Sequence, residues 1–94
     1  MSVVVWKHSL PAVVNNLDLA VGAKVLHFDE QPAVAAGLFL WEAHGTDVRP
    51  TETRTFQVVG TGDAADVDTG RHVGSVVTRI GLVFHLFETT DGAA

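Results

Sequence analysis

The clearest indication of the fold is ETRTFQVVG, residues 52–60. Two sets of side chains alternate along this segment: Thr53, Thr55, Gln57 and Val59 on one side, and Arg54, Phe56 and Val58 on the other. A period of two residues is that of a β-strand whose two faces lie in different environments. Threonine, valine and phenylalanine are also residues that strands favour. Residues 52–60 therefore predict a β-strand.

Outward from this segment, apolar stretches of similar length are separated by Gly, Pro, Asn and Asp. They recur about every 8–12 residues, which is typical of an all-β sandwich or barrel. We predict a small antiparallel β-sandwich or barrel of about six to seven strands. The other predicted strands are Val3–His8, Lys24–Asp29, Gly37–Ala43, Arg71–Thr78 and Leu82–Glu88.

Three further segments have a weaker strand pattern or contain a turn. Ala12–Leu19 alternates only weakly, so it is either a short edge strand or an ordered loop. The alanine-rich run before Gly37 allows a helical turn at Ala33–Ala36 as an alternative to extended chain. Gly81 is expected to form a tight turn between the last two strands. We expect one β domain over residues 1–88 and a flexible tail over residues 89–94.

Composition excludes several classes of protein. The 94 residues include 6 basic and 11 acidic side chains, a net charge of −5, which disfavours nucleic-acid binding. The absence of cysteine excludes disulfides and zinc ribbons. Apolar runs are far shorter than the roughly 20 residues that span a bilayer, and the N-terminus lacks the features of a secretion signal. We therefore expect a soluble, intracellular protein with no membrane partner.

Three runs are apolar on both faces of the predicted strand: residues 3–6, 38–41 and 82–87. In a two-layer sandwich only one face of a strand meets the core, so the other face needs cover from a loop or from a second molecule. We predict a homo-oligomer or a protein partner. The candidate interface residues are Val3, Val5, Trp6, Leu38, Leu40, Trp41, Val83 and Phe87.

The sequence gives no indication of a metal or catalytic site. The five histidines, His8, His27, His44, His72 and His85, lie on five different segments without a His-x-His pair. We interpret them as hydrogen-bonded side chains in or beside the core. The acidic loop of residues 63–70 lacks the EF-hand ligands, and Gly60-Thr61-Gly62 lacks the lysine of a P-loop. No nucleophile elbow or paired carboxylates are present, so we expect no cofactor, no metal and no enzymatic activity.

Arginines provide the remaining candidate site. Arg54, Arg71 and Arg79, with Lys24, are the cations available for a phosphate, provided that the fold brings them together. The simpler interpretation of Arg54 is a surface ion pair with Glu52.

Several motifs follow one another in an order that resembles a known protein family. The most specific are Gly60-Thr61-Gly62 and the segment LVFHLFE, residues 82–88. From Val5 to Glu88 the chain resembles small proteins of unknown function encoded mainly by tailed bacteriophages, including those of mycobacteria. In those relatives the Gly-Thr-Gly step continues with His-Pro, whereas this chain has Asp63-Ala64, so a ligand role for that histidine is in doubt here. The resemblance implies an all-β phage accessory protein and supplies no catalytic residues.

The leading functional hypothesis is a self-associating, non-enzymatic phage protein that binds a host protein in the host cytoplasm, during host takeover or counter-defence. One alternative is a structural or capsid-decoration protein of the virion. Another is a sponge that sequesters a nucleotide signal of host immunity between subunits.

Overall fold

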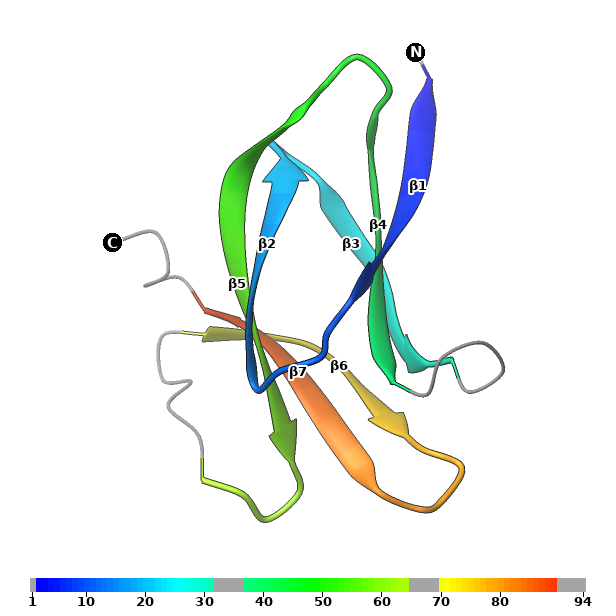
Figure 1. Cartoon of the computed structure of the whole chain (residues 1–94), viewed down its shortest axis with the longest axis vertical. Helices are drawn as coiled ribbons and strands as arrows, with labels where there is room; N and C mark the ends of the chain where they lie inside the picture. The colour runs from blue at the N-terminus through cyan, green and yellow to red at the C-terminus, as the bar shows by residue number, and fades with distance from the viewer. Residues whose placement is uncertain (1, 32–36, 65–69, 90–94) are drawn as a thin grey trace.

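The computed structural model describes residues 2–31, 37–64 and 70–89, which contain seven β-strands and no helix. The strands are β1 (Val3–Ser9), β2 (Val14–Ala20), β3 (Lys24–Glu30), β4 (Leu38–Gly45), β5 (Pro50–Gly60), β6 (Gly70–Val77) and β7 (Val83–Thr89). They form two antiparallel sheets, as Figure 1 shows. Sheet A has the order β1-β4-β3, and sheet B has the order β2-β5-β7-β6. The predicted all-β fold is confirmed. No described segment is a helix capable of crossing a membrane.

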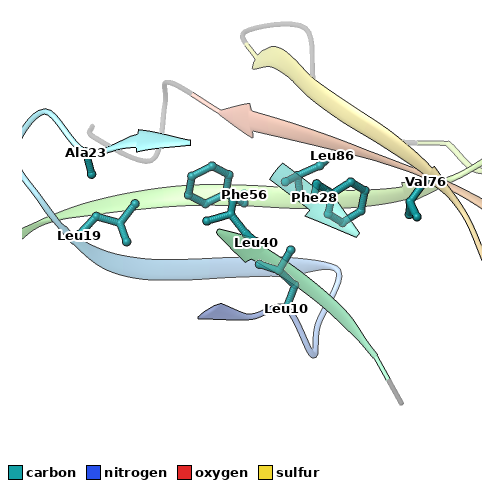
Figure 2. Close-up of a cluster of buried hydrophobic side chains, with 8 residues drawn as sticks. All are labelled: Leu10, Leu19, Ala23, Phe28, Leu40, Phe56, Val76 and Leu86. Carbon is teal, nitrogen blue, oxygen red and sulfur yellow. The ribbon is translucent and has the colours of Figure 1, made fainter. Parts of the chain in front are cut away.

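The core lies where the two sheets meet (Figure 2). Sheet A contributes Phe28 and Leu40, and sheet B contributes Phe56 and Leu86. The complete cluster is Leu10, Leu19, Ala23, Phe28, Leu40, Phe56, Val76 and Leu86. Burial of each large apolar side chain stabilises the fold by roughly 1.5–3 kcal/mol. These contacts between residues far apart in the sequence hold the two sheets together.

Residues 52–60 belong to the strand β5, as predicted, but burial does not alternate strictly along it. Phe56 is fully buried and lies opposite Glu88 in β7, and Thr53 is exposed, but Thr55 on the face opposite to Phe56 is also buried. Val58, two residues after Phe56, packs against the core cluster. The even-numbered residues of β5 thus face sheet A, and the odd-numbered ones face away from it.

The ambiguous segment Ala12–Leu19 forms an edge strand, β2, which pairs with β5. Asn15 is buried, and its side chain satisfies both backbone groups of Ala12. The Ala12 N–H donates to Asn15 Oδ1 at 3.1 Å, and Asn15 Nδ2 donates to the Ala12 carbonyl at 2.7 Å. Because asparagine can replace backbone hydrogen bonds in this way, its presence does not interrupt the strand.

Gly81 lies in the β6–β7 turn, as predicted, with a φ of 88° and its N–H donating to the Thr78 carbonyl at 2.9 Å. The alternative helical turn at residues 33–36, most of the acidic loop and residues 90–94 of the predicted tail lie outside the described residues. Thr89, the first residue of the predicted tail, belongs to β7 and pairs with Thr55.

The four edge strands fall into two pairs. β3 of sheet A packs against β6 of sheet B, so these two edges cover each other. β1 and β2 are the other edge strands, and within the described ranges each pairs with a neighbour on one side only. In Figure 1, β1 lies at the side of the molecule with its outer edge free of other strands.

Candidate functional site

The outer face of sheet A carries an exposed apolar surface. On β4, Leu40 faces the core, so Phe39 and Trp41 face away from sheet B. On β1, Val3 and Val5 lie on that same outer face, because Val5 is paired with Ala43. Val3 is 62% exposed and Val5 is 53% exposed. We call Val3, Val5, Phe39 and Trp41 the outer patch of sheet A.

Polar groups border the outer patch. The ring of His27 lies 5.5 Å from that of Trp41, measured between centroids, and Lys7 Nζ lies 4.9 Å from the centre of the Phe39 ring. His27 also hydrogen-bonds Asp29 at 3.1 Å. The pKa of Asp29 is lowered, first by the backbone N–H of Glu30 and then by His27. An apolar centre with a polar rim is the usual composition of a protein-binding surface.

Three predicted interface residues of sheet A do not lie in this patch. Leu40 is fully buried between the sheets, so its prediction as an interface residue is wrong for this fold. Leu38 is partly buried and packs against the same core. Trp6 is 43% exposed but belongs to the inner face of sheet A, where its ring meets His44 edge-on at 4.6 Å. Apolar runs in β1 and β4 therefore serve two different faces.

The remaining predicted residues, Val83 and Phe87, are half-buried on the outer face of sheet B. A chain of hydrogen bonds crosses this face. His85 bonds Ser75 at 2.7 Å and Thr61 at 2.9 Å, and Ser75 also bonds His72 at 3.0 Å. Polar side chains thus interrupt the apolar surface of sheet B, which makes it a poorer candidate than the outer patch of sheet A.

Glu42 is a fully buried carboxylate on the inner face of sheet A. Its Oε2 lies 2.9 Å from His8 Nε2, and its Oε1 lies 2.8 Å from His44 Nδ1. His8 and His44 are therefore hydrogen-bonded in or beside the core, as predicted. The buried carboxylate that binds them was missed, although a single acidic residue within the apolar run of β4 was a visible signal. No group of three or more His, Cys, Asp or Glu residues in the described part is placed to hold a metal ion.

Arg54 binds Glu88, and the predicted surface pair with Glu52 is wrong. Arg54 Nε and Nη2 donate to the two oxygens of Glu88 at 2.6 and 2.8 Å, and Nη1 donates to the Ala23 carbonyl at 2.6 Å. Arg54 is two residues from Phe56 in β5 and so lies on the same face of the strand. It therefore points into the cleft between the sheets. Two arginines hold the pKa of Glu88 below its ordinary value, Arg54 by hydrogen bonding first and Arg71 next after the opposing effect of burial. In return, Glu88 raises the pKa of Arg54.

The three arginines predicted as an anion site fall in two places. Arg71 Nη2 donates to Glu88 Oε1 at 2.9 Å and so joins Arg54. Arg79 lies in the β6–β7 turn, where its backbone N–H donates to Glu30 at 3.0 Å. Lys24, by contrast, lines the same cleft as Arg54 and Arg71.

The chain belongs to a family described as a domain of unknown function, DUF7352, whose model matches residues 1–94. No curated protein and no solved structure matches the chain. The family description assigns no activity.

Proposed function

We propose that this protein is a non-enzymatic β domain that acts by binding protein, and that its first partner is a second copy of itself. The observation that carries the proposal is the position of Val3 and Val5. Both are more than half exposed, and both lie on the edge strand β1, opposite Gly45 and Ala43 of β4.

The outer patch of sheet A supplies the driving force for association. Contiguous exposed apolar surface marks interaction sites, because covering it removes apolar area from water at roughly 25 cal/mol per Å². Trp41 and Phe39 add aromatic side chains, which are enriched at protein interfaces. A partner that covers these rings and the two valines gains more than one that covers the outer face of sheet B.

The β1 edge favours a second copy as the partner. An unpaired edge presents backbone donors and acceptors that another strand can use. Of the two edges that no strand covers in the described part, β2 carries Asp18, whereas β1 begins with Val3 to Trp6 and contains no acidic residue. In a chain with a net charge of −5, two copies meet with least repulsion at such an edge.

The geometry of β1 is compatible with a two-fold axis. An antiparallel pairing centred on Val5 places Lys7 opposite Val3 of the second copy, so no like charges face each other. Such a contact is isologous, the commonest arrangement in homodimers. It extends sheet A across both copies, so that the valines of the two copies meet at the axis. Phe39 and Trp41 then lie on a joined outer face that a further protein partner can cover.

A bacteriophage origin and a host protein as a further partner complete the proposal. The resemblance of residues 60–62 and 82–88 to phage proteins supports the origin, and with such an origin the protein would act in the host cytoplasm. In that setting the dimer blocks a surface of a host protein by occupying it.

The test is the mass of the protein in solution, measured by sedimentation or light scattering over a range of concentrations. We expect a dimer that becomes a monomer in Val5→Asp, because the carboxylates of the two copies would face each other across the two-fold axis. Circular dichroism should show an unchanged fold, since Val5 is exposed in the single chain. The matched control is Val77→Asp on β6, where the side chain is 68% exposed and the variant should stay dimeric.

A wild-type protein that is monomeric at every concentration would overturn self-association. So would a folded Val5→Asp variant that remains a dimer. If Val5→Asp unfolds, Val3→Lys at the more exposed position makes the same distinction.

A further inference from the structure

A cleft of about 460 Å³ opens where the edges of the two sheets meet at β3 and β6. Its volume is within the range of about 300–1,000 Å³ that small-molecule sites occupy. The turn before β3 forms one wall and β6 forms the other, with Arg54 of β5 between them. The lining residues are Gly22, Ala23, Lys24, Val25, Arg54, Arg71, His72 and Val73.

Two guanidinium groups meet at this cleft. Arg54 and Arg71, two of the chain's 6 basic residues, line it, and both bind Glu88, which with Glu52 lines the adjoining cavity around the same arginines. Two guanidinium groups against one bound carboxylate leave positive charge at the cleft, although acidic residues outnumber basic ones in the chain by 11 to 6. Such a local positive charge attracts an anion.

Glu88 fixes the positive groups without neutralising them all. It lies at one side of the cleft and binds Arg54 through two hydrogen bonds, so Arg54 is held rigidly between the walls. Arg71 gives Glu88 only one of its nitrogens, and its side chain is 69% exposed. A guanidinium has five N–H donors, so most of those on Arg71 remain available to a ligand.

We propose that the cleft between β3 and β6 binds a small phosphate monoester, with Arg71 as its ligand and Arg54 as the fixed charge behind it. Lys24 lines the cleft but pairs with Ala43, so its side chain lies on the outer face of sheet A and is not counted as a ligand. A monoester carries a charge of about −1.5 to −2 at pH 7, which complements the positive charge that the two arginines keep beside one carboxylate. The planar fork of an arginine can donate to two phosphate oxygens.

The apolar walls of the cleft favour a phosphate monoester over inorganic phosphate. Val25 and Val73 are half-buried, pack against the core and line the cleft beside the cations. The organic group of a monoester can lie against them, whereas inorganic phosphate cannot use this surface. The site lies on β3 and β6 and does not depend on the β1 contact proposed above.

The test is a titration followed by amide NMR at low salt, with inorganic phosphate and with phenyl phosphate as probes. We expect saturable shifts at the amides of residues 22–25 and 71–73. Phenyl phosphate should bind several-fold more tightly than inorganic phosphate, because its ring covers the two valines. Shifts that do not saturate, or that are spread over the surface without a maximum at these residues, would overturn the proposal.

Two variants make the test specific. Arg71→Gln should raise the Kd for phenyl phosphate about tenfold, the factor expected when a charged hydrogen bond is lost. Arg79→Gln is the matched control, because it removes the same charge from a turn outside the cleft and should leave the Kd unchanged. Equal weakening by both variants would mean general attraction to positive charge and would refute the site. If Arg71→Gln disturbs the fold, Arg71→Lys replaces it, because lysine keeps the charge but lacks the planar fork and should also weaken binding.

Discussion

Glu42 lies in an environment that is unusual for a glutamate. Its side chain is fully buried, and each of its oxygens meets a histidine nitrogen. Removal of the carboxylate leaves the ring nitrogen of His44 buried without a partner, because His44 itself is almost inaccessible to water.

Glu42→Leu should therefore lower the free energy of unfolding by about 1–3 kcal/mol, the usual cost of an unsatisfied buried polar group. Glu42→Gln should cost less, since an amide offers one acceptor and one donor and a neutral imidazole can meet either. Urea unfolding of the two variants and the wild type measures the difference. Equal stabilities for Glu42→Leu and Glu42→Gln would show that the hydrogen bonds to the histidines contribute nothing.

For single residues, the sequence predicted whether a side chain is hydrogen-bonded better than it predicted which residue is the partner. The interpretation of His8 and His44 as hydrogen-bonded side chains was correct, because an imidazole within an apolar strand needs a partner wherever it lies. The partner of Arg54 was predicted wrongly. Glu52 is two residues away, whereas Glu88 is 34 residues away and becomes adjacent only through the pairing of β5 with β7.

Among the elements, the β6–β7 turn depends most directly on one backbone conformation. Gly81 has a φ of 88°, a value that residues with a side chain rarely adopt, and a Cβ added there would meet no atom within 4 Å. The cost of a substitution is therefore conformational and not steric.

Gly81→Ala should lower the free energy of unfolding by about 1–2 kcal/mol, the cost of a left-handed conformation for a residue with a Cβ. Gly37→Ala is the control, because Gly37 has no positive φ and an added Cβ would make only an ordinary contact with Phe39 at 3.9 Å. Thermal unfolding of both variants compares them. A Gly81→Ala protein as stable as Gly37→Ala would show that the turn accommodates a side chain by changing its conformation.

The strands themselves were predictable because alternation is a local property. Ala12–Leu19 was the uncertain segment, since two consecutive asparagines weaken its apolar pattern, and it contains most of β2. Pairing with β5 and the hydrogen bonds between Asn15 and Ala12 make this segment a strand. Neither contact was predictable, because the sequence of one strand does not give its register with another. The apolar runs in β1 and β4 were correctly expected to serve two faces, but which residue faces the core depends on the sheet order.

At the scale of the whole molecule, one ion-pair cluster connects both sheets. Arg54 on β5 and Arg71 on β6 bind Glu88 on β7, and Arg54 also donates to the Ala23 carbonyl in the turn that leads into sheet A. Protonation of Glu88 weakens these contacts together, so the stability of the entire fold should respond to acid.

The direction follows from the lowered pKa of Glu88. A carboxyl group whose pKa is lower in the folded state contributes stability above its unfolded pKa, near 4.5, and loses it as the pH falls through the folded value. Glu88→Gln should thus be less stable than the wild type at pH 7, and the difference should shrink below pH 4.5. Urea unfolding of both proteins at a series of pH values measures it. A difference that is the same at every pH would mean that the charge of Glu88 does not stabilise the fold.

The mutual cover of β3 and β6 limits how copies of this molecule can assemble. Those two edges pack against each other, and β2 is polar, so the proposed self-association would use β1 as the single pairing edge of each subunit among the described strands. A two-fold pairing occupies that edge on both copies. If the copies pair in this way, assembly through β1 ends at two subunits instead of continuing into a fibre.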